Sequence, residues 1–198
     1  MFGLSRSSVR EAVRELSALG ILSARRGDGT YVSSLDSEHL FAPLEFALRV
    51  DPKLFLHMAD LRLILEPHIA NVATARITPQ GIETLSRAVA MYGEEVESPS
   101  PDVARLLEID KQIHQTLVHF AGNPLLAAMV RSIDATVRCG REVIVVERTG
   151  SAESLNELRA LVDAVIARDP ARAQAAMTWH VTRWAERIRT ELTTDPAG

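Results

Sequence analysis

The chain has 198 residues with a formal net charge of −4, and 46% of them are hydrophobic, so it can bury a core without disulfides. Its one cysteine, Cys139, excludes an intrachain disulfide framework and is typical of a reducing compartment. No apolar run approaches the ~18 residues of a transmembrane helix, and the N-terminus lacks the pattern of a signal peptide, so we expect a cytoplasmic protein without a membrane partner.

The first predicted element is a helix that begins after Ser5 and ends at Gly20. The Ser5 hydroxyl can accept a first-turn N–H, apolar residues then recur at helical spacing, and glycine commonly ends a helix. Arginine and serine side chains lie largely off the apolar stripe, at Arg6, Ser7, Ser8, Arg10 and Arg14. Such a helix suits the DNA major groove, where arginine can bind guanine with two hydrogen bonds.

Two short strands are predicted next, over residues 21–24 and 30–33, around a basic tip that contains Gly27 and Gly29. Glycines let the backbone of such a tip approach a DNA backbone or minor groove closely. Residues 1–32 carry five arginines against three acidic residues, whereas the rest of the chain is acidic, which favours a small end that contacts nucleic acid. The alternative is an amphipathic surface helix that leads into a hairpin.

The remainder of the chain has helical patterns and no convincing strand alternation. A short connecting helix is predicted over 37–50, after a polar joint. Several of the later helices begin with proline at the first helical position, and together they predict a compact antiparallel bundle. The predicted body helices cover residues 52–76, 79–97, 101–121, 124–148, 152–168 and 170–193.

Three polar residues lie on faces that the pattern turns inward. Asp110 and His114 are one turn apart on the apolar stripe of the 101–121 helix, and His180 lies on the stripe of the last helix. Burying these groups without partners is costly, and one divalent cation would satisfy all three. The alternative is a hydrogen-bonded Asp–His pair, with His180 elsewhere in the core.

The N-terminal motif, in residues 5–12, 19–22 and 26–32, resembles the winged helix-turn-helix of the GntR family of bacterial transcription regulators. Family members carry two more helices before this point, so we expect a truncated winged helix-turn-helix over 1–33 and a linker over 34–51. The resemblance implies contacts with double-stranded operator DNA from Arg6, Ser7, Ser8 and Arg10 on the helix, and from Arg26 and Gly27 at the wing.

The body, over residues 52–193, resembles the FadR subgroup with its FCD effector domain; the motifs lie in 61–67, 110–126 and 169–180. In many members an aspartate and three histidines bind zinc, nickel or a similar ion, which helps to hold a small carboxylate effector. Asp110, His114 and His180 match three of these ligands. The family has histidine where this chain has Leu158, so we expect a three-ligand site whose open positions take water or effector.

Two arginines are candidate effector-binding residues. Arg62 lies one turn before Glu66 on the first body helix and could clamp an effector carboxylate. The alternative is an intrahelical surface ion pair, which contributes little. Arg138, near the inward face of the 124–148 helix, is the second candidate.

The sequence thus predicts a mainly α protein that acts as a ligand-responsive transcription regulator, with repression relieved by a small organic acid as the commoner family mode. A homodimer would present two recognition helices about one DNA turn (~34 Å) apart. Two alternatives are a metal-dependent enzyme, in which the Asp/His/His group activates water, and a sensor or dimerisation module that no longer binds DNA. Because no His-Glu-x-x-His spacing supplies a general base, we expect no enzyme.

Overall fold

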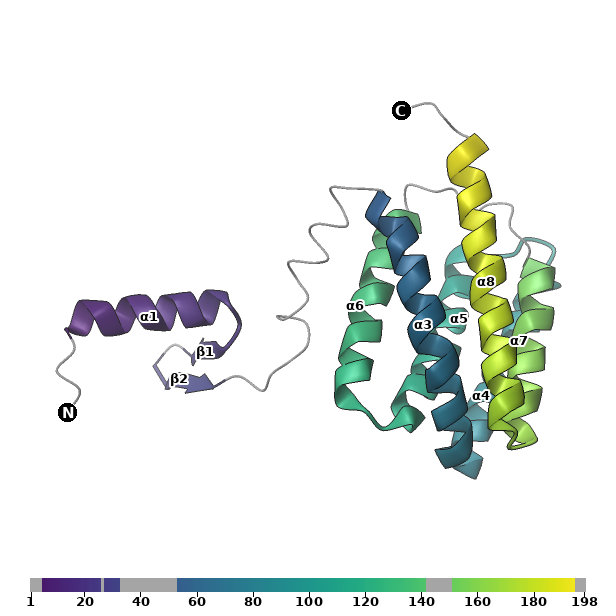
Figure 1. Cartoon of the computed structure of the whole chain (residues 1–198), viewed down its shortest axis with the longest axis horizontal. Coiled ribbons are helices and arrows are strands. Elements are labelled where there is room, and N and C mark those ends of the chain that lie inside the picture. Colours follow the sequence, from purple (N-terminus) through teal and green to yellow (C-terminus); the bar gives the residue numbers. More distant parts are fainter. Residues whose placement is uncertain (1–4, 26, 33–52, 142–150, 195–198) are drawn as a thin grey trace.

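The computed structural model describes residues 5–25, 27–32, 53–141 and 151–194, and it contains an N-terminal helix with a β-hairpin and a helical bundle (Figure 1). The N-terminal helix is α1 (Arg6–Ala18). The Ser5 hydroxyl accepts a hydrogen bond from the Ser8 amide at 3.1 Å, and Gly20 follows the helix with a φ of 71°. The predicted cap and terminator are therefore both confirmed.

The apolar stripe of α1 exists as a face, but the described part of the chain leaves most of it exposed. No residue of α1 is buried. Val9, Leu16 and Leu19 are all exposed. Because α1 lacks a buried face, capping and backbone hydrogen bonds contribute more to its local stability than burial of apolar surface does.

The hairpin consists of β1 (Leu22–Arg25) and β2 (Gly29–Val32), which pair antiparallel with Leu22 opposite Val32 and Arg25 opposite Gly29. Each strand is shifted by one residue from its predicted range. The connecting turn has φ values of 82° at Gly27 and 127° at Gly29, which glycine adopts at little steric cost. The turn residue between Arg25 and Gly27 lies outside the described residues.

Several helices of the bundle begin at prolines, as predicted. Thr78 caps one helix by accepting the Gly81 amide, and Asp102 caps the next by accepting the Ala104 and Arg105 amides. The predicted helix over 37–50 and the residues 142–150 lie outside the described ranges. The bundle helices are α3 (Lys53–Arg76), α4 (Pro79–Val96), α5 (Val103–Ala121), α6 (Pro124–Arg141), α7 (Ser151–Ile166) and α8 (Pro170–Thr194).

The core of the bundle forms where α3 packs against both α8 and α5, while α4 packs on α5 and α7 (Figure 1). Ile113, Leu117 and Leu161 are fully buried there, and burial of such side chains is the main stabilising contribution. None of the helices in the described ranges combines the length and apolar character that crossing a bilayer requires.

Candidate functional site

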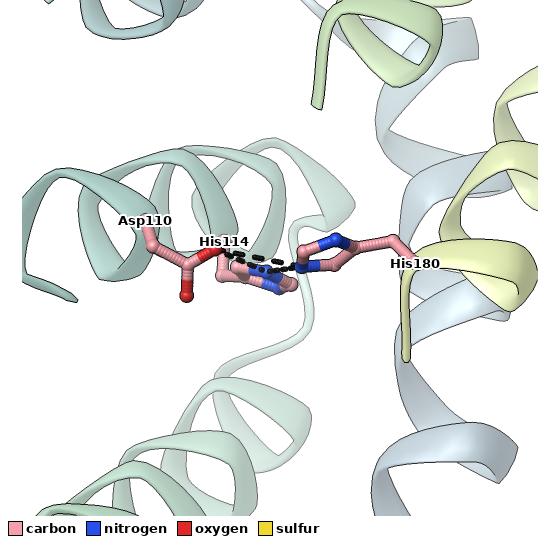
Figure 2. Close-up of side chains that lie close together, drawn as sticks. All are labelled: Asp110, His114 and His180. Atoms are coloured by element: carbon pink, nitrogen blue, oxygen red, sulfur yellow. Dashed lines mark hydrogen bonds and ion pairs between the residues drawn. The ribbon is translucent and has the colours of Figure 1, made fainter. Parts of the chain in front are cut away.

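The three predicted metal ligands converge inside the bundle. Figure 2 shows Asp110 and His114 on α5 pointing toward His180 on α8. The two histidine Nε2 atoms are 3.3 Å apart, and Asp110 Oδ1 lies 3.4 Å from Nε2 of His180 and 3.7 Å from Nε2 of His114. Their candidate ligand atoms all lie within 4.8 Å of one another, so one ion could contact all three.

Local helix geometry explains how each side chain reaches this point. Asp110 and His114 are four residues apart on α5, which places both on one face of that helix. His180 on α8 lies between the buried residues Met177 and Val181. Both histidines are buried, and Asp110 is the partly exposed member of the group.

The other ring nitrogen of each histidine faces a glutamate. His180 Nδ1 is hydrogen-bonded to Glu157 Oε2 at 2.9 Å. His114 Nδ1 lies 2.8 Å from Glu66 Oε2, which is an ion-pair distance, but its direction does not satisfy hydrogen-bond geometry. Carboxylates behind metal-binding histidines are common, because they orient the ring and make the ligating nitrogen more basic.

Each glutamate is in turn held by an arginine. Arg62 donates from Nε and Nη2 to Glu66. Arg187 donates from Nη1 and Nη2 to the two oxygens of Glu157, at 3.0 and 3.3 Å. Two Arg–Glu–His chains, one on either side, therefore meet at Asp110.

The electrostatics of the group place positive charge at its centre. Burial alone would lower the pKa of His114, but Glu66 and Asp110 outweigh it and raise that pKa to about 10. Burial alone would raise the pKa of Asp110, but His114 and His180 hold it well below its ordinary value. The arrangement therefore favours a cation among ionised carboxylates, either a proton on His114 or a metal ion.

The donor set fits a divalent transition metal. If Nδ1 of each histidine carries the proton, both Nε2 atoms are acceptors, and they lie 3.7 and 3.4 Å from Asp110 Oδ1. For His180, the hydrogen bond between Nδ1 and Glu157 supports this proton position. Three such acceptors at close range could hold a metal ion between them, and imidazole nitrogen with carboxylate oxygen suits divalent transition metals.

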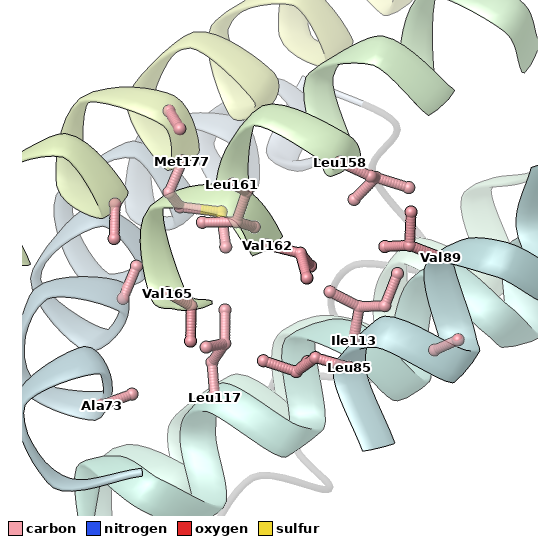
Figure 3. Packing of buried hydrophobic residues seen from close by; sticks show 14 of the residues in the cluster. Ala73, Leu85, Val89, Ile113, Leu117, Leu158, Leu161, Val162, Val165 and Met177 are labelled. Carbon is pink, nitrogen blue, oxygen red and sulfur yellow. The ribbon is translucent and has the colours of Figure 1, made fainter. Parts of the chain in front are cut away.

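Leu158 does not take part in the group. It is fully buried and belongs to the apolar core together with Val89 and Ile113 (Figure 3). The neighbouring Asn156, which could in principle replace a missing ligand, is exposed. Helix α7 therefore supplies no ligand atom to the group among the described residues, although its Glu157 contacts His180.

Arg62 and Glu66 form an intrahelical ion pair, which was the alternative prediction for these residues. The prediction that this pair lies on the surface is wrong. Their side chains are only 4% and 3% exposed, because α8 covers this face of α3. The Arg62 guanidinium also lies 4.3 Å from the ring centre of Trp184, a cation–π distance. The side chain of Arg138 lies outside the described residues.

Sequence reasoning missed the residues that surround His180 in the Arg187–Glu157–His180 series of contacts. No role was predicted for Glu157, Arg187, Ser154 or Tyr92. Helical spacing contained a signal, since Glu157 is four residues before the buried Leu161 and therefore shares its inward face. Burial, together with the nearby Asp110, raises the pKa of Tyr92, so the phenol stays neutral.

The predicted DNA-contacting residues of α1 are all exposed: Arg6, Ser7, Ser8 and Arg10. The Ser7 and Ser8 hydroxyls lie 2.8 and 2.9 Å from the Ser5 hydroxyl. These three serines thus form a polar cluster at the first turn, beside the exposed arginines. Such a surface is compatible with phosphate and base contacts.

The wing is held by contacts across its turn. The Tyr31 hydroxyl donates to the Asp28 carbonyl at 3.1 Å, and the Arg25 guanidinium lies over the Tyr31 ring at 5.2 Å. Gly27 is exposed, whereas Arg26 lies outside the described residues. The hairpin thus presents a preorganised tip with a basic side chain beside it.

Comparisons with known protein families match both parts of the chain. The FCD domain matches residues 57–183, which is more than half of the chain. The bacterial regulatory proteins of the gntR family match residues 1–32. This chain belongs to the GntR family of regulators and carries an FCD domain.

Individual relatives agree with this assignment. The HTH-type transcriptional regulator LutR of Bacillus subtilis is 28% identical over 91% of this chain and 83% of its own length. A putative L-lactate dehydrogenase operon regulatory protein of Escherichia coli is 26% identical over 91% of this chain and 70% of its own length. The structure of a Streptococcus agalactiae GntR protein, 29% identical, covers 93% of this chain and 83% of its own, with a TM-score of 0.70. The chain is therefore a transcriptional regulator of the GntR family.

Proposed function

We propose that this regulator senses a small organic acid through a divalent metal held by Asp110, His114 and His180. The observation that carries the proposal is the convergence of Asp110 Oδ1 and the two histidine Nε2 atoms within 3.3–3.7 Å. Three protein ligands leave coordination positions that water or an effector can take. When bound, the metal would act as a Lewis acid toward an effector oxygen.

The charges of the group support an anionic effector. With neutral histidines, the two arginines and three carboxylates of the group leave one net negative charge. A divalent metal reverses that sign, so the loaded site attracts a carboxylate. Zinc and nickel are the candidate ions, because both accept imidazole and carboxylate ligands.

Arg62 remains our candidate for an effector-binding arginine, acting beside the metal. Its guanidinium is buried and contacts Glu66, which lies 2.8 Å from the ligand residue His114. A carboxylate effector bound at the metal would therefore lie near the buried positive charge of Arg62 and be attracted by it. Arg138 is the second candidate, on its sequence position alone.

For DNA recognition we propose that Arg6 and Arg10 make the main base and phosphate contacts, with Ser7 and Ser8 assisting. Arg26 and Gly27 at the wing would reach the minor groove. We further propose a cytoplasmic homodimer that presents two recognition helices about 34 Å apart. Effector binding would favour one arrangement of these helices, most simply by relieving repression.

The metal site is tested by titrating the chelator-treated chain with Zn²⁺ and with Ni²⁺ in a calorimeter. We expect binding of one ion per chain, and loss of that binding in His180→Ala. His119→Ala is the matched control, because His119 is an exposed histidine at the end of α5. Absence of binding by the unaltered chain would remove the metal from the proposal.

Effector binding is tested next with small carboxylic acids on the zinc-loaded chain. L-lactate is the first compound to try, since the Escherichia coli relative is named for an L-lactate dehydrogenase operon. We expect at least one of these acids to bind the metal-loaded chain and to bind His180→Ala much more weakly. Equal binding to both forms would show that the metal does not hold the effector.

A further inference from the structure

We infer that Glu157 is a positioning residue for the metal site: it holds His180 with Nδ1 protonated, so that Nε2 is the ligating atom. The inference rests on the proposed metal binding and adds a role for a residue that is not itself a ligand. Glu157 Oε2 lies 2.9 Å from His180 Nδ1. The Nε2 atom, on the other side of the ring, is the one that faces Asp110 and His114.

The carboxylate of Glu157 is itself fixed by several contacts. Arg187 on α8 donates to both of its oxygens, and the same guanidinium donates to the Ser154 hydroxyl at 3.2 Å. Glu157 is buried, so water does not compete for these hydrogen bonds. A carboxylate held in this way accepts the Nδ1 proton in one orientation of the imidazole ring.

The opposite side of the site is built differently, which singles out Glu157. Glu66 approaches His114 Nδ1 to 2.8 Å, but the direction is not that of a hydrogen bond. His114 is also fixed by its place on α5, one turn from Asp110. His180 comes from a different helix, and its Nδ1 forms a hydrogen bond with Glu157 that His114 Nδ1 does not form with Glu66.

Glu157→Gln tests this role with a nearly isosteric change that removes the carboxylate charge. The measurement is the Zn²⁺ dissociation constant, determined by competition with a chromophoric chelator. We expect affinity to fall about 10- to 100-fold, the usual cost of losing such a partner of a ligating histidine. An unchanged dissociation constant would overturn the inference.

Glu153→Gln is the matched control on the same helix. Glu153 lies one turn before Glu157, and its carboxylate is 3.8 Å from the same Arg187 guanidinium. It is 61% exposed, and it forms ion pairs with Arg183 and Arg187. We expect the zinc affinity of Glu153→Gln to match that of the unaltered chain. A loss of affinity equal to that of Glu157→Gln would show a general charge effect and would overturn the inference.

The protonation pattern of His180 gives a second test that does not depend on any variant folding. In the zinc-loaded, ¹⁵N-labelled chain, long-range ¹⁵N–¹H spectra distinguish the protonated ring nitrogen from the coordinating one. We expect the His180 proton on Nδ1 and zinc on Nε2; zinc on Nδ1 would overturn the inference. Failure of the unaltered chain to bind zinc at all would instead reject the proposed metal site, so the two failures are distinguishable.

Discussion

His114 and His180 face each other across the centre of the helical domain, with their Nε2 atoms 3.3 Å apart and their ring planes inclined by 34°. The residues around them carry charge instead of apolar surface. A hydrophobic bundle therefore contains a polar centre in which every carboxylate faces a histidine or an arginine. Such a centre is costly to break, because removal of one partner leaves a buried charge unpaired.

The resemblance to FCD domains places a fourth ligand at position 158, which suggests a gain-of-binding test. Leu158→His should tighten Zn²⁺ binding, because zinc prefers four protein or water ligands in tetrahedral arrangement. Without metal, the same variant should be less stable, since a fully buried leucine is lost. Chelator competition and thermal unfolding with and without zinc provide the two measurements.

Leu161→His is the control for that test. Leu161 is equally buried on α7, so it should show the same loss of metal-free stability without tighter zinc binding. If both variants bind zinc like the unaltered chain, position 158 does not face the metal.

Breaking the buried Arg62–Glu66 pair should destabilise the bundle strongly. Arg62→Met leaves Glu66 ionised in the core without its guanidinium, and such losses cost about 3–5 kcal/mol. The control is Arg87→Met on α4, where the pair with Glu83 has the same spacing but side chains that are 71% and 68% exposed. That change should cost about 0–1 kcal/mol. Urea unfolding measures both values, and equal losses would contradict the buried pair.

Metal-free stability should depend on the charge of His114. The pKa of His114 is about 10 in the folded chain, against an ordinary value of 6.5. The positive charge therefore stabilises the fold fully below the ordinary value, and this contribution is lost as the pH rises through 10. We expect His114→Gln to cost several kcal/mol near pH 6 and progressively less toward pH 10.

Urea unfolding of the chelator-treated proteins across this pH range is the measurement. His119→Gln serves as the comparison, because His119 is exposed and its replacement should cost little at any pH. A cost of His114→Gln that does not change with pH would show that this histidine is neutral in the folded chain.

Arg10→Ala should weaken binding to a duplex that the unaltered chain selects from a random pool. A good bidentate arginine–base contact contributes about 1–3 kcal/mol, and fluorescence anisotropy at fixed salt measures the loss. Zinc binding should be unchanged. Arg87→Ala, an exposed arginine on α4, is the control; equal affinity of the Arg10 variant and the unaltered chain would reject the assigned contact.

Two helix glycines should respond oppositely to alanine. A Cβ on Gly81 would meet the Phe120 ring and lie 2.7 Å from Ile77 Cγ1, so we expect a loss of about 1–3 kcal/mol from overpacking. On Gly93 the nearest atom would be a flexible arginine nitrogen at 3.4 Å, so alanine there should be neutral or stabilising. Thermal unfolding checks both, and equal effects would contradict the packing of α4 on α5.

Local signals in the sequence were sufficient for the elements and for part of the site. The Ser5 cap, the terminator Gly20 and the prolines at helix starts act within one turn of chain, so their effects are readable without a structure. Apolar periodicity on α5 and α8 identified Asp110, His114 and His180 as inward-facing. The same periodicity also places Glu157 on an inward face, but it carries no information about which residue of another helix lies opposite.

The tertiary structure alone decided the partners. Only the packing of α7 on α8 brings Glu157 to His180 and Arg187, and only the cover of α8 over α3 makes the Arg62–Glu66 pair a buried one. Helical periodicity fixes the direction of a side chain relative to its own axis, whereas contacts between helices depend on their relative shift and rotation. The sequence by itself therefore determined the helices and three candidate ligands, and packing between helices determined the charged groups that contact those candidate ligands.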